Sequence, residues 1–383
     1  MKINNSLALL VFVVLVLNSR YHYALEKQDD GIMIELSKKK ATDAKMMKIQ
    51  VCTENIIRVI SAPEKAFSNR PSLIVNETEW QPVAWSMQED GDLISISTAK
   101  VMLKIHREKG TVAFYNAEGK LILQEKADDS KIITPVEVMG EQTYHIQQLF
   151  DSPEEEAFYG LGQHQNNIMN YKGHDVDLWQ HNCVAVVPFL FSSRNYGILW
   201  DNNSRTKLGD IRDFQSLASL KLYDKEGKEG GLTAEYFETL DFTSLFTSRR
   251  EPRIEHEFID INDAFPQGFH DNVASVRWSG EIECHESGVH KFRLYCSGYT
   301  KMWLNGELVV ESWRQNWLPW THLPRIEMEA GKRYSLKIEW VHSNGYIGLK
   351  YLPPEKEENK NSLSLYSEVA DQIDYYFIHG DNL

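Results

Sequence analysis

The chain has 383 residues, of which 42% are hydrophobic and 11% aromatic, so it predicts two or three domains with packed cores and excludes a disordered chain. Its 41 basic and 55 acidic residues give a formal net charge of −14 at pH 7. This balance argues against nucleic acids and anionic membranes as partners, because both bind basic surfaces. A neutral ligand is compatible with it.

The start of the chain predicts an export signal. Lys2 supplies a positive charge, and the eleven residues from Leu7 to Leu17 are all apolar. A membrane span needs about 20 such residues, whereas a shorter run is typical of a cleaved signal peptide. We therefore expect a signal peptide at residues 1–24, cleaved after Ala24 or alternatively after Ser19, and a secreted or periplasmic protein that does not contact a membrane after cleavage. An uncleaved anchor or a buried strand is the alternative.

Short apolar or alternating segments follow one another along the next hundred residues and predict β-strands. Turn residues such as Asp90-Gly91-Asp92 and Lys109-Gly110 separate them, and long segments with helical periodicity are nearly absent. The chain is therefore expected to be all-β, built of packed sheets. The clearest strands are expected at residues 48–53, 56–60, 93–97, 101–105 and 112–115.

Two polar, charged stretches divide the second half of the chain. Residues 224–231 and 353–362 flank a block of about the size of one domain. After this block, residues 363–366 and 375–378 again have the pattern of strands. The final segment is too short for a core of its own, which favours an insertion over three consecutive domains. We expect one domain made of residues 25–225 and 363–383, and a second domain, 229–352, inserted into it.

Four cysteines are too few for a disulfide scaffold in a chain of this length. Cys284 and Cys296 lie on what are expected to be neighbouring strands, so one bridge between them is an alternative. Free buried thiols are the favoured interpretation for all four, Cys52 and Cys183 included.

Several motifs in order carry a resemblance to a known family over residues 30–225 and 363–383. Together they resemble the mutarotase-like N-terminal β-sandwich of glycoside hydrolase family 31. The amino-acid sequences of these motifs are most similar to those of bacterial α-xylosidases, which trim xyloglucan oligosaccharides. The motifs are Asn55–Val59, Phe158–His164, Lys172–Asn182, Val187–Ser193, Tyr196–Asn202 and Asp374–Gly380.

In that family a (β/α)8 barrel follows the sandwich and carries an aspartate nucleophile and an aspartate acid/base. Retaining chemistry needs two carboxyl groups about 5–5.5 Å apart, and a barrel needs about 250 residues. The sequence ends at Leu383 without such a segment. The resemblance therefore implies a non-catalytic N-terminal portion, with no catalytic residue and no activity alone. Its partners would be the missing C-terminal barrel and a xyloglucan-type oligosaccharide. A stand-alone carbohydrate-binding or adhesion protein, or an inert remnant of a split gene, is the alternative.

The inserted block resembles the protective-antigen module, a β-sandwich found in adhesins, toxins and glycosidases. Sugar-binding yeast members hold calcium with an Asp-Asp pair, and here that region is Cys296-Ser-Gly-Tyr-Thr300, which offers no carboxylate pair. We therefore expect no metal and no cofactor. The motifs are Gly231–Phe237, Val276–Gly280, Gly288–Phe292, Met302–Val309, Ala330–Tyr334 and Ile338–Trp340.

The first candidate site is the loop Tyr171–Asn182. The resemblance implies that this loop lines the pocket for the terminal sugar, with an aspartate near its end. Asn182 takes that position here, and His181, Asp175 and Asp177 are alternatives. A metal site that combines His181 with His164 and His174 is disfavoured, because the three lack tight ligand spacing.

The second candidate site is a group of tryptophans in the inserted block. Trp317 and Trp320 lie in a stretch without strand alternation, and exposed indole faces can stack on sugar rings. Packing against a partner domain is the alternative. Trp303 and Trp313 belong to the module's framework pattern and are expected in the core.

Overall fold

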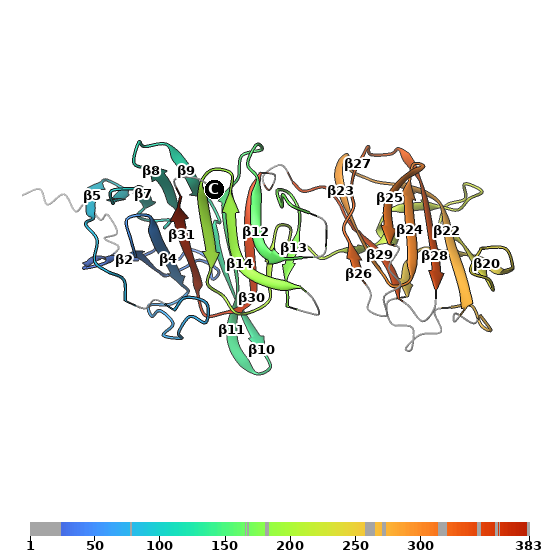
Figure 1. Cartoon of the computed structure of the whole chain (residues 1–383), viewed down its shortest axis with the longest axis horizontal. Coiled ribbons are helices and arrows are strands. Elements are labelled where there is room, and N and C mark those ends of the chain that lie inside the picture. The colour runs from blue at the N-terminus through green and yellow to red at the C-terminus, as the bar shows by residue number, and fades with distance from the viewer. Residues whose placement is uncertain are drawn as a thin grey trace, which may run out of the picture. The chain divides into compact units, whose positions relative to one another are not determined.

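The computed structural model describes residues 24–76, 79–164, 166, 168–180, 184–256, 265–269, 273–312, 320–342, 346–356, 359 and 361–380. The described residues form two compact units (Figure 1). The first takes its residues from Met1–His164, Met169–Gly209 and Ser362–Leu383, and the second from Gln165–Ile168 and Asp210–Asn361.

The first unit contains an eight-stranded antiparallel sheet in which the last strand of the chain occupies the middle. Strand β31 (Ile373–His379) pairs with β4 (Ile56–Ala62) on one side and with β15 (Tyr196–Trp200) on the other. The C-terminal segment is thus a central part of a sheet that begins near residue 25. The remaining strands are β1 (Leu25–Gln28), β2 (Gly31–Glu35) and β3 (Met46–Val51) beyond β4, and β14 (Ala185–Ser192) and β12 (Phe158–Gln163) beyond β15.

A second sheet completes the first unit. Its order places β30 (Ser362–Ala370) between β16 (Thr206–Leu208) and β11 (Glu141–Asp151). The strand β13 (Val176–Leu178) forms one edge, and β10 (Lys131–Val138) pairs with β11. Beyond β11 the order continues with β9 (Leu121–Glu125), β8 (Val112–Asn116), β7 (Val101–His106), β6 (Leu93–Ser97) and β5 (Ser86–Asp90).

The core of the first unit lies between these two sheets, because inward side chains alternate with outward ones along the strands. In β3 and β7 every second residue is buried. Phe114 of β8 stacks on Phe377 of β31 at 4.1 Å between ring centroids, which joins the two sheets directly. Hydrophobic alternation in the sequence therefore accounts for the packing.

The second unit is also a sandwich of two antiparallel sheets. Its 3-10 turn η1 spans Leu217–Ser219. One sheet has the order β17 (Gln215–Ser216), β29 (Ile347–Leu352), β23 (Gly288–Cys296), β26 (Trp320–His322), with β21 (Ile254–His256) on β29 and β27 (Arg325–Met328) on β23. The other has the order β20 (Leu245–Glu251), β19 (Leu232–Phe237), β22 (Ala274–Glu283), β28 (Arg333–His342), β24 (Tyr299–Leu304), β25 (Glu307–Ser312), with β18 (Lys221–Tyr223) on β22.

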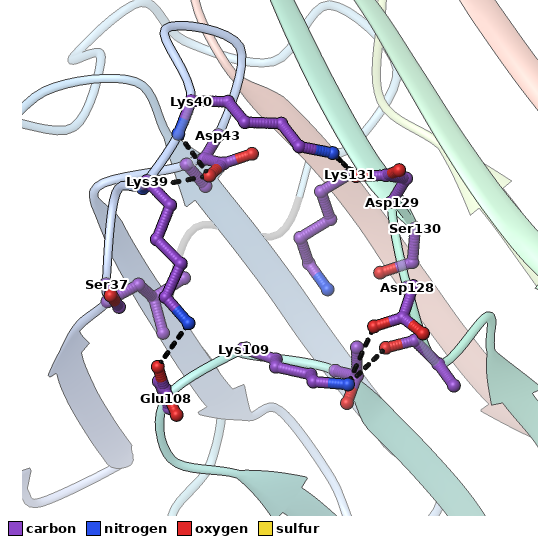
Figure 2. A pocket seen from close by; sticks show the side chains of 14 residues that line it. Ser37, Lys39, Lys40, Asp43, Glu108, Lys109, Asp128, Asp129, Ser130 and Lys131 are labelled. Carbon is purple, nitrogen blue, oxygen red and sulfur yellow. Dashed lines mark hydrogen bonds and ion pairs between the residues drawn. The ribbon is translucent and has the colours of Figure 1, made fainter.

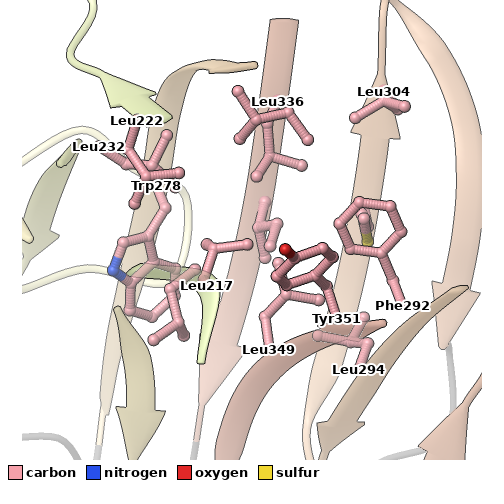
Figure 3. Close-up of a cluster of buried hydrophobic side chains, with 14 of the residues drawn as sticks. Leu217, Leu222, Leu232, Trp278, Phe292, Leu294, Leu304, Leu336, Leu349 and Tyr351 are labelled. Carbon is pink, nitrogen blue, oxygen red and sulfur yellow. The ribbon is translucent and has the colours of Figure 1, made fainter. Parts of the chain in front are cut away.

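Large side chains from both sheets fill the core of the second unit (Figure 3). Trp278 of β22 and Phe292 of β23 are completely buried there, and so is Leu217 of η1. Leu217 precedes the expected start of the second domain at residue 229, and β17 and β18 on either side of it pair with strands of the second unit. The segment from 215 to 223 therefore contributes to this core.

The prediction of an all-β chain with a second β-sandwich inserted near the C-terminal end of the first is confirmed. None of the described residues belongs to an α-helix. No described helix is long and apolar enough to span a bilayer. The expected signal peptide at 1–24 lies almost wholly outside the described residues.

The described cysteines are buried free thiols, as the sequence favoured. Cys52, Cys284 and Cys296 form no disulfide. Burial raises the pKa of Cys52 to about 12 and that of Cys296 to about 11, so both stay protonated at neutral pH. Cys183 lies outside the described residues.

Candidate functional site

The candidate loop Tyr171–Asn182 begins at a firmly held base. The Tyr171 side chain is buried, and its backbone N–H donates to the carbonyl oxygen of Phe158 at 2.9 Å. The Asn170 side-chain oxygen accepts from the backbone N–H groups of Phe158 and Lys172, both at 3.0 Å. These contacts tie the start of the loop to β12.

The Lys172 side chain links the loop to a buried carboxylate network. Its ammonium donates to the carbonyl oxygens of Ser152 and Pro153, both at 2.8 Å, and to the Ser152 hydroxyl. That hydroxyl donates in turn to Glu156, which also accepts from Ser192 and Tyr196. Burial lowers the pKa of Lys172. The network ties the base of the loop to the buried Glu156.

The glycines of the motif Phe158-Tyr-Gly-Leu-Gly allow β12 to pair with β14 through a register shift. Gly160 and Gly162 have φ values of +100° and +94°, and Leu161 between them has +63°. A Cβ atom on Gly162 would lie 2.0 Å from the carbonyl oxygen of Ala185. Only glycine fits that close approach of two backbones, so the strand pairing by itself explains why the motif has glycine at position 162.

Asp175, a sequence candidate, lies on the loop just before β13 and is half-buried. Its carboxylate packs closely on the backbone of Gly209, where an added Cβ would lie 2.5 Å from Asp175 Oδ1. Gly209 has a φ of +100°. The backbone at Gly209 therefore limits where the Asp175 carboxylate can lie.

The structure adds Trp179, which the sequence analysis did not select. It follows β13, its side chain is 56% exposed, and the Arg205 guanidinium lies 5.6 Å from its ring centroid. Arg205 forms an ion pair with Asp177, which raises the pKa of the guanidinium. The signal that could have identified Trp179 is the alternation in Val176-Asp-Leu178, which is buried, exposed, buried.

The Gln180 side chain forms hydrogen bonds with residues that follow the candidate loop. Its side-chain amide donates to the carbonyl oxygen of Val184, and its side-chain oxygen accepts from the backbone N–H of Val186 at 3.0 Å. The two ends of the segment that contains His181 and Asn182 are thereby linked. His181 and Asn182 themselves lie outside the described residues.

In the second unit, Trp320 is the first residue of β26, pairs with Cys296 of β23 and is half-buried. Trp317 and Trp313 lie outside the described residues. Trp320 and Asp175 belong to different units, so the structure describes the two candidate sites separately.

The expectation that Trp303 is a core residue is wrong. It is half-buried in β24, between the buried Met302 and Leu304, and the Lys337 ammonium lies 3.7 Å from its ring centroid. Successive residues of a strand point to opposite faces, so Trp303 takes the outward face of the sheet.

The segment Cys296–Thr300, which lacks a carboxylate pair, is held by neutral hydrogen bonds at Ser297. The Ser297 carbonyl oxygen accepts from the Trp340 indole N–H at 2.7 Å, and its hydroxyl accepts from the backbone N–H of Tyr346 at 2.7 Å. Within the described part of the chain, no three His, Cys, Asp or Glu side chains are grouped so that they could hold a metal ion.

Two cavities in the first unit are bordered by other residues. One of about 190 Å³ lies among three loops (Figure 2), and one of about 290 Å³ is bordered by Arg58, Asp201 and Asp374. Neither is lined by a sequence candidate. The charged groups around the first cavity are paired with one another, as Lys39 with Glu108, Lys40 with Asp129 and Lys109 with Asp128.

Comparison with known proteins identifies both halves of the architecture. Residues 46–208 match the N-terminal galactose mutarotase-like domain of glycosyl hydrolase family 31, and residues 228–364 match the PA14 domain. The crystal structure of the family 31 α-xylosidase from Xanthomonas citri is similar over 93% of this chain and 38% of that chain, with a TM-score of 0.84 and 39% sequence identity.

Two curated relatives match shorter stretches. An α-xylosidase of Saccharolobus solfataricus is 28% identical over 209 residues, which are 51% of this chain and 26% of that protein. The anti-sigma-I factor RsgI3 of Acetivibrio thermocellus is 27% identical over 137 residues, or 36% of this chain and 21% of that protein. The chain therefore spans only about a quarter of the first of these relatives. It contains the N-terminal galactose mutarotase-like domain of glycoside hydrolase family 31 with a PA14 domain inserted into it, and it resembles the N-terminal, non-catalytic part of the α-xylosidases of that family.

Proposed function

We propose that this chain is the non-catalytic N-terminal portion of an exported, α-xylosidase-like retaining glycosidase that acts on xyloglucan-type oligosaccharides. The similarity of 93% of the chain to the Xanthomonas citri α-xylosidase, at 39% identity, carries this proposal. The apolar run at Leu7–Leu17 supports export to the periplasm or the medium.

In this proposal the first domain supplies one wall of the sugar pocket through the loop Tyr171–Asn182. A sugar hydroxyl can donate to the Asp175 carboxylate or to an Asn182 oxygen, and His181 can supply a further hydrogen bond. The anchored base at Tyr171 and Lys172 supports this role, because a binding group held in advance loses little entropy when the sugar arrives.

The PA14 domain would bind sugar rings through Trp317 and Trp320. Indole rings stack on the C–H faces of sugar rings at about 0.5–1.5 kcal/mol per aromatic contact. This route needs no calcium and no other cofactor. The catalytic aspartates would come from a C-terminal barrel, the partner that the resemblance implies.

Replacement of the matching part of the Xanthomonas citri α-xylosidase by this chain tests the pocket-wall role. The hybrid should hydrolyse an aryl α-xyloside, and this chain alone should not do so above a mock purification. Asp175→Ala and Asn182→Ala should raise the KM of the hybrid. Asp90→Ala is the matched control, because Asp90 is exposed at the opposite edge of the same sheet.

Two results would overturn the proposal. One is turnover by this chain alone that disappears when one of its own acids is replaced. The other is a hybrid whose KM does not change with either loop variant. Glycan binding by this chain together with an inactive hybrid would support a stand-alone carbohydrate-binding protein.

A further inference from the structure

One face of the second sheet of the first unit carries a continuous row of polar and aromatic side chains. Register places Asp177 of β13 opposite Lys207 of β16, and Lys207 opposite Tyr366 of β30. Tyr366 is in turn opposite Gln147 of β11. All four side chains are exposed or half-buried, whereas their neighbours Leu178, Thr206 and Ser367 are buried. The row therefore lies on the outer face of these four strands.

A second row runs beside the first and contains Trp179 and Arg205. Arg205 is adjacent to Thr206, and its carbonyl oxygen accepts from the backbone N–H of Glu368 at 3.1 Å. The Arg205 guanidinium lies beneath the exposed Trp179 ring, at 5.6 Å from the centroid. We call the surface formed by Asp177, Trp179, Arg205, Lys207, Tyr366 and Gln147 the outer platform.

The aromatic rings of the outer platform are held in place by their neighbours. The Lys207 ammonium lies 5.9 Å from the Tyr366 ring centroid, and the His145 ring centroid lies 5.8 Å from it. His145 is fixed by a contact of 2.6 Å between its Nδ1 and the carbonyl oxygen of Glu368. Both Tyr366 and Trp179 thus have a cation at one face, which limits the orientations of the rings.

The charges of the outer platform are balanced when the neighbouring Glu368 is counted with them. Arg205 pairs with Asp177 and, at 3.3 Å, with Glu368. Together with Lys207 these groups carry two positive and two negative charges. A face with paired charges gives no net attraction to an anionic or cationic partner, but its donors, acceptors and rings suit a neutral ligand with many hydroxyl groups.

We propose that the outer platform binds the chain of a neutral oligosaccharide beyond its terminal sugar. Four antiparallel strands are about 15 Å across, since neighbouring strands lie about 4.8 Å apart. That width exceeds one sugar ring. Trp179 lies within the candidate loop Tyr171–Asn182, directly after β13, so the platform extends the proposed pocket wall across the sheet. This inference rests on the proposed function in that both assign a glycan as the ligand.

Titration calorimetry of the full chain with xyloglucan oligosaccharides of increasing length tests the platform. Affinity should rise with length beyond one sugar ring and should change little between 50 and 500 mM salt. Tyr366→Ala should weaken binding by about five- to tenfold, the effect of one aromatic contact. Tyr115→Ala is the matched control, because Tyr115 lies in β8 of the same sheet with Lys104 5.1 Å from its ring centroid.

A second measurement needs no variant. Hydroxyl-radical oxidation of the unaltered chain should be reduced at Trp179 and Tyr366 by the longest oligosaccharide, and not at Tyr115. Equal oxidation of Trp179 and Tyr366 with and without this ligand would overturn the platform even if Tyr366→Ala failed to fold. Tighter binding of a polygalacturonate oligosaccharide than of the neutral one would also contradict it.

The two proposals fail in different ways. If Asp175→Ala and Trp320→Ala weaken binding but Tyr366→Ala does not, the platform is wrong and the proposed function stands. If no oligosaccharide binds this chain, the platform is also wrong, and the hybrid enzyme decides the proposed function separately.

Discussion

Glu125 in the first sandwich and Glu251 in the second are both buried, but the two carboxylates are stabilised by different means. In the first unit the Glu125 side chain is completely buried and forms an ion pair with Lys131, whose side chain is only 4% exposed. The Tyr375 hydroxyl donates to the same carboxylate at 2.7 Å, and so does the backbone N–H of Val112 at 3.0 Å. A buried cation therefore balances the charge in this core.

In the second unit the Glu251 carboxylate is held mainly by neutral donors. The Tyr236 hydroxyl donates to it at 2.5 Å and the Trp278 indole N–H at 2.7 Å, and the partly exposed Arg249 donates at 2.6 Å. Burial alone would raise the pKa of Glu251, but the nearby His256, the Tyr236 and Trp278 donors and the Arg249 charge outweigh burial and lower it to about 2. The His256 Nε2 atom lies 4.0 Å from the carboxylate.

Because the two carboxylates are stabilised differently, different changes should destabilise them. A carboxylate paired with a buried cation depends on that cation, because removing one charge leaves the other unpaired in a medium that solvates it poorly. The stability contributed by a carboxylate that accepts hydrogen bonds from tyrosine and tryptophan depends on whether that carboxylate is ionised. The site of Glu125 should therefore respond most to loss of Lys131, and the site of Glu251 to acid.

The largest expected effect concerns the limits of the second sandwich. A fragment of residues 210–361 should unfold in one cooperative transition, whereas a fragment of 229–352 should be mostly unfolded. The shorter fragment lacks Leu217, Leu220 and Leu222, which are buried in the core (Figure 3). Loss of a buried leucine side chain costs about 2–5 kcal/mol, and a whole domain is stable by only about 5–15 kcal/mol. Calorimetry of both fragments checks this, and equal melting temperatures would contradict it.

In the first sandwich, Lys131→Met should lower the free energy of unfolding by about 3–5 kcal/mol, because Glu125 is left as an unpaired buried charge. Urea denaturation followed by the fluorescence of the full chain provides the measurement.

The double variant Lys131→Met/Glu125→Gln is the control for this prediction. It removes both charges and keeps an oxygen to accept from Tyr375, so it should recover part of the lost stability. A double variant less stable than Lys131→Met would mean that packing of the lysine chain, and not charge balance, is what the core requires.

In the second sandwich, acid should reduce stability through Glu251. Its folded pKa of about 2 is below its usual 4.5, so its contribution is fully present above pH 4.5 and is lost as the pH falls toward 2. A shift of this size corresponds to about 3 kcal/mol. In the 210–361 fragment, Glu251→Gln should be less stable at pH 7 and should lose less stability between pH 5 and pH 2.5. Parallel pH profiles for variant and unaltered fragment would assign the acid sensitivity to other carboxylates.

The sequence predicts much of the fold and less of the site, for identifiable physical reasons. Alternation along Val101–His106 shows directly which side chains face a core, and the same alternation in Met302-Trp-Leu304 shows that Trp303 faces outward. That pattern outweighs the general tendency of tryptophan to be buried. The fold class could be predicted because it depends on such local periodicity.

Partners distant in sequence are harder to predict. The ion pair of Arg205 with Asp177 joins the residue before β16 to β13, and the Lys207–Tyr366 contact spans 159 positions. Neither follows from spacing, because strand register across a sheet depends on the whole fold. Trp179 was therefore visible as a tryptophan in the sequence, but not as part of a surface with Arg205 and Tyr366.

The smallest expected effect is that of a chelator, and it applies to both sandwiches alike. In the second unit, hydrogen bonds from Trp340 and Tyr346 occupy the oxygens of Ser297 in the segment Cys296–Thr300, which has no carboxylate pair. Hard cations such as calcium require several oxygen ligands, usually with carboxylates among them. EDTA should therefore change neither the melting temperature of the full chain nor its affinity for a xyloglucan oligosaccharide. A measurable fall in either that added calcium reverses would place a metal site in one of the sandwiches, and the 210–361 fragment would show which one.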